Sequence, residues 1–120
     1  MIRLVKFVGI PVADQERALG FYRDKLGFKV HTDQPLGAQR WIELKIPGSD
    51  TAVVLFTPDG QENRVGTFFN GAFGCDNVRK TYDELTARGV MFSGEPKEEP
   101  WGTHAKFVDS EGNTFVLSSR

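Results

Sequence analysis

The two halves of this 120-residue chain carry the same pattern of aspartate and glycine. Three residues recur 62 positions further on: Gly9, Asp14 and Gly27 correspond to Gly71, Asp76 and Gly89. An aspartate can accept hydrogen bonds from the first turn of a helix, and a glycine readily takes the left-handed conformation found at helix ends. The pattern therefore predicts a strand, a capped helix and a turn in each half.

The segments around these residues have the periodicity of a β-α-β-β-β unit. Apolar strands are predicted over residues 4–12 and 67–75, and each runs into an aspartate and then a helix. The helices carry apolar stripes, Leu19, Tyr22 and Leu26 in the first and Val78, Tyr82 and Leu85 in the second. Further strands are predicted over residues 28–33, 40–46 and 51–57, and then over 91–94, 104–109 and 113–118.

These elements predict an α+β fold. Two tandem β-α-β-β-β modules, residues 1–58 and 67–120, would form a single domain with a short linker between them. Their strands would make a curled mixed sheet, a half-barrel around a cleft, with the helices on the outer face. In residues 40–46 apolar side chains alternate with Trp41, Glu43 and Lys45, so one strand face should pack on a helix and the other should face the cleft.

Composition limits the possible partners. The net charge of -1 gives no electrostatic attraction to nucleic acid, and no basic stripe interrupted by aromatic residues is present. The apolar N-terminal stretch is far shorter than the roughly 20 residues of a membrane span. Cys75 is the only cysteine, which excludes an internal disulfide and is typical of a cytoplasmic protein. We expect neither nucleic acid nor a membrane as a partner.

Two motifs are similar to those of a known superfamily. Residues 12–14 lead to the helix end FYRDKLGF over residues 21–28, and DSEGN over residues 109–113 resembles a turn written DP-x-GN. Together they resemble the vicinal oxygen chelate superfamily, which includes glyoxalase I, extradiol dioxygenases and bleomycin-resistance proteins. The resemblance covers nearly the whole chain and implies the half-barrel described above.

The resemblance also implies where a metal would be bound. Metal-using members place four ligands, usually His and Glu, on the inner face of the half-barrel, and these positions correspond here to Phe7, Leu55, Asn70 and Val116. Only Asn70 has a side chain that can coordinate a divalent ion, and it does so poorly. A shift of one residue brings no better ligand to any position. We therefore expect no divalent metal and no other cofactor.

Aromatic residues are the alternative means of binding a ligand in such a cleft. The candidates are Trp41, Phe56, Phe68, Phe69 and Trp101. Most phenylalanines of a small domain belong to its core, and Phe56 is expected to face the helix. Trp41 and Trp101 are the better candidates, because Trp101 lies in a Pro-Trp-Gly loop where packing seldom requires an indole.

The two histidines lie outside the implied metal positions. His31 is expected to be an exposed strand residue, whereas His104 begins a strand and would point into the cleft together with Lys106. If the protein were an enzyme, His104 could act as the general base, with Tyr22 or Lys106 assisting.

The sequence thus leaves three interpretations. The first is a metal-free binding protein, a homodimer, that sequesters a small aromatic or amphipathic compound between residues such as Phe7, Trp41, Leu55, Asn70, Trp101, His104 and Val116. The second is an enzyme of the same superfamily, similar to lactoylglutathione lyase or to a dioxygenase, with a non-standard metal site or with His104 as base. The third is an accessory domain without a ligand.

Overall fold

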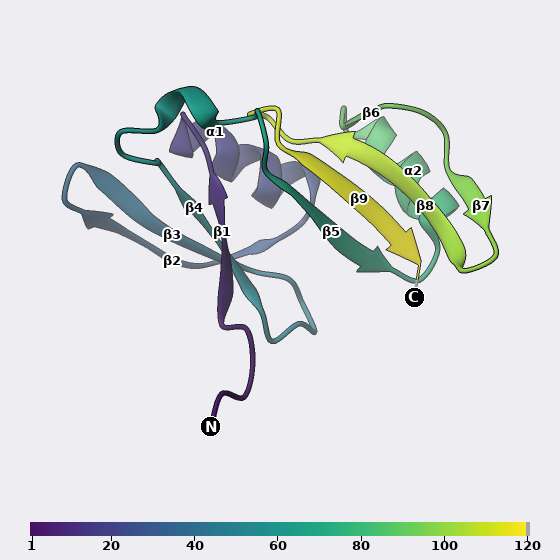
Figure 1. Ribbon diagram of the computed structural model, residues 1–120, viewed down its shortest axis with the longest axis horizontal. Coiled ribbons are helices and arrows are strands. Elements are labelled where there is room, and N and C mark those ends of the chain that lie inside the picture. The colour runs from purple at the N-terminus through teal and green to yellow at the C-terminus, as the bar shows by residue number, and fades with distance from the viewer. Residues whose placement is uncertain (120) are drawn as a thin grey trace.

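Each half of the chain builds one sheet and places one helix across it. The computed structural model describes residues 1–119. Figure 1 shows the two sheets side by side, with the helices behind them in this view. The strands of residues 1–119 form two open sheets that do not close into a barrel, so the α+β fold with two tandem modules is confirmed. Within this described part of the chain, no helix is long and apolar enough to cross a membrane.

The first module has its strands in the order β1-β4-β3-β2. Its elements are β1 (Phe7–Pro11), α1 (Gln15–Gly20), the π-helical turn η1 (Phe21–Lys25), β2 (Lys29–Leu36), β3 (Gln39–Lys45) and β4 (Ala52–Phe56). Strand β1 is parallel to β4, whereas β3 is antiparallel to both of its neighbours. A short 3-10 helix, η2 (Glu62–Arg64), lies in the segment that connects the modules.

The second module repeats this plan with the order β5-β9-β8-β6. Its elements are β5 (Asn70–Cys75), α2 (Val78–Ala87), β6 (Met91–Phe92), β7 (Lys97–Glu99), β8 (Gly102–Val108) and β9 (Thr114–Ser119). The strand predicted over residues 91–94 is shorter than expected, and β7, which the sequence did not predict, also pairs with β8. The two module-opening strands begin at Phe7 and Asn70, three residues later than predicted.

The helix caps differ from the sequence prediction in one module. Asp14 caps α1 as predicted, with a carboxylate oxygen 3.0 Å from the amide nitrogen of Arg17. Helix α2 is capped by Asn77 rather than Asp76, because the Asn77 side chain accepts from the amide of Lys80 at 2.9 Å. The caps are therefore 63 residues apart, while the helix-ending glycines, Gly27 and Gly89, are 62 apart.

The π-helical turn accounts for this difference of one residue. In η1 the amide of Leu26 donates to the carbonyl of Phe21, five residues earlier, at 3.2 Å. Such a turn accommodates one more residue than an α-helical turn does. The first helix therefore has one residue more than the second between its cap and its terminal glycine. No sequence pattern indicates where this residue is inserted.

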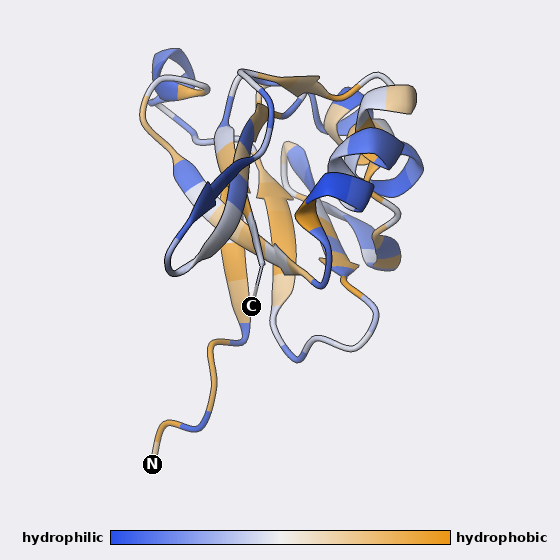
Figure 2. Ribbon diagram, turned by 90° about the vertical axis from the view of Figure 1, so that its right-hand side faces the viewer, coloured by the Kyte–Doolittle hydropathy of each residue, from blue (hydrophilic) through white to orange (hydrophobic). Residues whose placement is uncertain are grey.

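The core lies between the sheets and the helices and continues from one module to the other. Ile42 and Leu44 of β3 are fully buried toward the helix, as the alternation in residues 40–46 predicted. Across the module boundary, the rings of Phe28 and Phe73 meet at a centroid distance of 5.5 Å. Figure 2 shows apolar residues concentrated on the central strands, whereas the helices contain many hydrophilic residues.

A polar cluster joins the turn of residues 109–113 to the first module. The Tyr22 hydroxyl donates to an Asp109 carboxylate oxygen at 2.7 Å. The Asn113 side-chain amide donates to the Pro11 carbonyl at 2.8 Å and to Asp109 at 2.9 Å. Burial and the neighbouring Asp109 charge raise the pKa of Tyr22 well above its usual range, so its hydroxyl remains a donor.

The same turn also holds the N-terminus of α1. Glu111 accepts from the backbone amide of Asp14 at 3.2 Å and pairs with the Arg17 guanidinium at 2.8 Å. A carboxylate at this place satisfies an otherwise free donor and interacts favourably with the helix dipole. The second module therefore completes the helix cap of the first.

Replacing Tyr22 with Phe should destabilise the protein by about 1.5–3 kcal/mol, because a buried carboxylate loses a hydrogen-bond donor. Urea denaturation at neutral pH would measure the change. Tyr82→Phe is the matched control, since the half-buried Tyr82 ring packs on Phe92 and its hydroxyl bonds to no group within residues 1–119. Equal, small effects of the two substitutions would show that the Tyr22–Asp109 bond contributes little.

Candidate functional site

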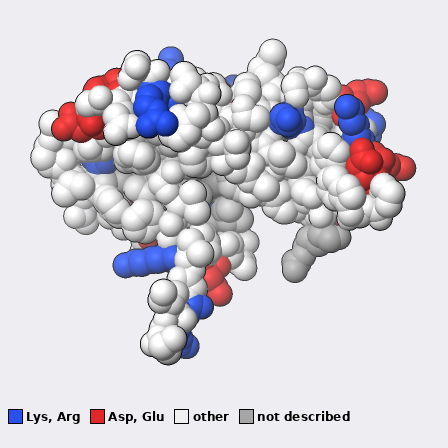
Figure 3. All heavy atoms as spheres, in the orientation of Figure 1, with Lys and Arg blue, Asp and Glu red and all other residues white. Residues whose placement is uncertain are grey.

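The face of each sheet that is turned away from the helices is here called the open face. On β1 and β4, Ile10 and Leu55 belong to the buried core, so Gly9, Pro11 and Phe56 lie on the open face. On the second sheet, Phe115 and Leu117 of β9 are likewise core residues, which leaves Val116 on the open face. Figure 3 views this face and shows acidic atoms at the two ends of the molecule and beside the projecting N-terminal segment, with basic groups on the upper face between the ends.

Two cavities lie on the open face and share a wall. The first has a volume of 480 Å³ and is bounded by β1, β4 and the connecting segment. The second has a volume of 470 Å³ and is bounded by the connecting segment, β5, β8 and β9. Phe68 and Phe69 line both cavities, which are therefore adjacent across the module boundary and together make up a trough. We call it the trough throughout.

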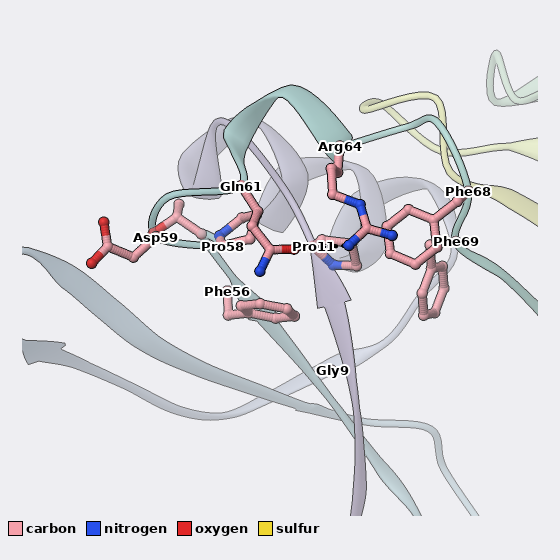
Figure 4. Close-up of a pocket in the computed structure, with 10 residues that line it drawn as sticks. Gly9, Pro11, Phe56, Pro58, Asp59, Gln61, Arg64, Phe68 and Phe69 are labelled. Atoms are coloured by element: carbon pink, nitrogen blue, oxygen red, sulfur yellow. Dashed lines mark hydrogen bonds between the residues drawn. The ribbon is translucent and has the colours of Figure 1, made fainter.

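The connecting segment supplies the polar groups of the first cavity (Figure 4). Arg64 projects from η2 toward Pro11, and its guanidinium lies over the Phe68 ring, 4.2 Å from the centroid. One of its amino groups donates to the Gln61 side chain at 2.9 Å. Asp59 also borders the cavity, but its carboxylate points away from Arg64 and Phe68. The polar groups that face this cavity are therefore mainly donors.

The second cavity combines one cation with neutral side chains. Lys106 of β8 lies opposite Val116 of β9, and Asn70 of β5 pairs with Thr114. All four residues line the cavity. The first cavity is lined mainly by apolar surface and the second by polar and apolar surface in similar amounts, and each contains one basic residue.

The structure corrects one of the four implied metal positions. Leu55 has no exposed surface and belongs to the core under α1, whereas Phe56, which the sequence placed toward the helix, lines the trough. The strand register explains the error. Val54 lies opposite Gly9, two residues after Phe7 in β1, and Val116 lies opposite Ala72, two residues after Asn70 in β5. Val54, and not Leu55, is therefore the equivalent of Val116. Because β4 reads AVVLF and is apolar on both faces, it offers no alternation from which its orientation could be predicted.

The corrected positions do not fit a divalent ion. They are occupied by Phe7, Val54, Asn70 and Val116, of which only Asn70 carries a side-chain oxygen. Among residues 1–119, no three His, Cys, Asp or Glu side chains are close enough together to hold a metal. Asn70 and Val116 line the second cavity, and Phe7 lies on the open face of the first sheet.

The predicted tryptophans lie outside the trough lining. Trp41 meets the Phe7 ring edge to face at 5.5 Å on the open face, and its indole nitrogen lies 3.3 Å from Glu43. Trp101 is 65% exposed and stacks on His104 with the ring centroids 5.1 Å apart. His104 is also 3.7 Å from Glu99 and borders a smaller cavity of 180 Å³ that includes Lys106. Trp101 and His104 therefore form a separate cluster beside the trough.

Sequence reasoning missed the contribution of the connecting segment. Residues 58–64 were interpreted only as a linker, yet Gln61 and Arg64 line the first cavity. The one available signal was the spacing of Arg64 and Phe68, a cation and an aromatic ring four residues apart in a polar stretch. His31, by contrast, lies exposed on β2 as expected.

Comparison with known proteins identifies the family. Residues 4–117 match the model of the Glyoxalase/Bleomycin resistance protein/Dioxygenase superfamily. The chain belongs to this superfamily. The protein YetH of Bacillus subtilis strain 168 is 32% identical over 118 residues, which cover 98% of each chain.

Two solved structures are similar over almost their entire length. UcmS2 is 34% identical, with a TM-score of 0.88 and 98% of each chain covered. TnmS3 of Streptomyces sp. CB03234, described as an antibiotic binding protein, is 36% identical, with a TM-score of 0.86 and coverage of 98% of this chain and 96% of its own. Both similarities support the two-module fold described above.

Replacing Leu55 and Val116 with alanine should show which of the two residues lies in the core and which lines the trough. Leu55→Ala should cost about 2–5 kcal/mol, since it leaves a cavity in a fully buried cluster. Val116→Ala should cost less than about 1 kcal/mol, because the side chain is only partly buried at the trough. Urea denaturation measures both, and equal costs would contradict the register assigned to β4.

Proposed function

We propose that the protein binds a small aromatic or amphipathic organic molecule in the trough and sequesters it without a metal ion. The observation that supports this proposal most directly is the trough itself, two adjoining cavities of 480 and 470 Å³ that share Phe68 and Phe69. Sites for organic ligands are typically concave, mostly apolar and furnished with a few polar groups that fix orientation.

The aromatic side chains of the trough can supply the binding energy. Phe68 is 56% exposed, and Phe56 and Phe69 are partly exposed beside it. A planar ligand that covered these rings would remove apolar surface from water, worth about 25 cal/mol for each Å². Stacked or edge-to-face ring contacts would add about 0.5–1.5 kcal/mol each.

The relatives favour the same class of function. TnmS3, 36% identical to this chain, is described as an antibiotic binding protein. Sequestration needs a pocket and affinity but no catalytic groups, which agrees with apolar residues at Phe7, Val54 and Val116. Among the residues that line the trough, Asp59 is the only acidic one, and its carboxylate faces away.

Phe68→Ala should weaken the binding of a planar probe, phenanthrene-9-carboxamide, about 5- to 10-fold, because the ring forms the wall shared by both cavities. Fluorescence titration would give the affinity, and urea denaturation should show stability unchanged within about 0.5 kcal/mol for an exposed residue. Met91→Ala, an exposed apolar residue of β6, is the control and should bind as the wild type does.

Three outcomes of this titration bear on the proposal. No binding of any planar aromatic probe would refute it. A loss of affinity in Trp101→Ala, with none in Phe68→Ala, would place the site at the Trp101–His104 stack instead. Retention of about one equivalent of nickel, zinc, manganese or ferrous iron after buffer exchange would favour the enzymatic interpretation, with His104 and Glu99 as the first residues to replace.

We also propose that the protein is a homodimer located in the cytoplasm. Four apolar residues that precede β1 are exposed to solvent: Met1, Ile2, Leu4 and Val5. An exposed apolar segment of this kind is typical of a contact with another chain. Light scattering should therefore give twice the mass of 13.4 kDa, and Leu4→Asp with Val5→Asp should shift the protein toward monomer. A monomeric wild type at micromolar concentration would contradict this assignment.

A further inference from the structure

Resting on the proposed binding function, we infer that the ligand is a planar aromatic acid and that Arg64 is the residue that selects its acidic group. Three observations support it: one guanidinium lies within the trough, it has no carboxylate partner among residues 1–119, and the charges that face the same cavities are mainly positive.

Arg64 has no carboxylate partner within residues 1–119. The guanidinium groups of Arg17, Arg23 and Arg40, by contrast, lie 2.6–2.9 Å from aspartate or glutamate oxygens. Within this part of the chain, the Arg64 guanidinium donates only to the neutral Gln61 side chain, through a single amino group. A guanidinium offers five donors in a planar fork, so most of the donors of Arg64 remain available to a ligand.

The Phe68 ring fixes the orientation of this fork. With the guanidinium carbon 4.2 Å from the ring centroid, the cation–π contact keeps the exposed Arg64 side chain against the wall of the first cavity. Figure 4 shows the guanidinium directed toward Pro11, on the side of the cavity that Phe56 and Phe69 also border. A ligand whose ring lies on these phenylalanines would bring a substituent to the Arg64 donors.

The neighbouring charges favour an anionic substituent. Lys106 adds a second cation at the other end of the trough. The Asp59 carboxylate points away from Arg64, and Glu62, on the same short helix, accepts from the Gly60 amide at 2.9 Å. A carboxylate or phenolate would therefore be attracted, whereas a cationic ligand would be repelled.

A carboxylate also matches the geometry of the donors. Arginine binds a carboxylate through two parallel N–H···O bonds, and charge-assisted bonds of this kind are about twice as strong as neutral ones. A carboxamide of the same shape has one acceptor oxygen and no charge. A pair of ligands that differ only in this group isolates the contribution of Arg64.

The experiment compares phenanthrene-9-carboxylic acid with phenanthrene-9-carboxamide on the wild type and on Arg64→Gln, by calorimetric or fluorescence titration. The wild type should bind the acid about 10-fold more tightly than the carboxamide, a difference of roughly 1.4 kcal/mol in binding free energy. Arg64→Gln should remove this preference and leave the affinity for the carboxamide within about 2-fold. Arg23→Gln, which removes the same charge from an exposed arginine paired with Asp24, should keep it.

The outcomes separate the inference from the proposed function. Equal binding of acid and carboxamide by the wild type would overturn the inference and leave the binding function standing. An acid preference that survives in Arg64→Gln would overturn the role of Arg64. Failure of both probes to bind any variant would instead refute the binding function. Unfolding curves of Arg64→Gln would show whether a loss of affinity comes from a loss of folded protein.

Discussion

The carboxylate of Asp109 is the group through which the two modules are held in one arrangement. It accepts from the Tyr22 hydroxyl, from the backbone amides of Glu111 and Asn113, and from the Asn113 side chain. Because this carboxylate is buried, each of these donors offsets part of the cost of removing its charge from water. Of these bonds, the one from Tyr22 crosses to the first module, where it acts together with the Asn113–Pro11 bond and the continuous apolar core to position the second sheet.

The same contact determines where the trough lies. The connecting segment passes against the turn of residues 109–113 so closely that a side chain at Gly66 would collide with the Glu111 carbonyl. Gly66 also has a φ of +76°, a conformation that suits glycine best. From this fixed point the chain continues to Phe68 and Phe69, the shared wall of both cavities. A requirement of the fold thus places the aromatic residues that we propose bind the ligand.

The sequence predicted the architecture better than the site. The repeated aspartates and glycines, together with the alternation in residues 40–46, predicted two similar modules, because caps, turns and buried faces leave local signals. The orientation of β4 could not be predicted, since a strand that is apolar on both faces has no local signal and is oriented by its pairing with β1. Arg64 could not be assigned because its local contacts with Gln61 and Phe68 do not reveal that β1 and β4 complete a cavity beside it.

The π-helical turn and the Asp109 cluster also make the two modules unequal. The residue equivalent to Asp109 in the first module, 63 positions earlier, is Ile46, and it lines apolar cavities of 380 and 210 Å³ at the module boundary. One side of that boundary is therefore held by directional hydrogen bonds and the other by apolar contacts, which have no preferred direction. The repeat is thus symmetric in plan but chemically asymmetric: polar contacts join the modules through the Asp109 cluster, and apolar surfaces meet around Ile46.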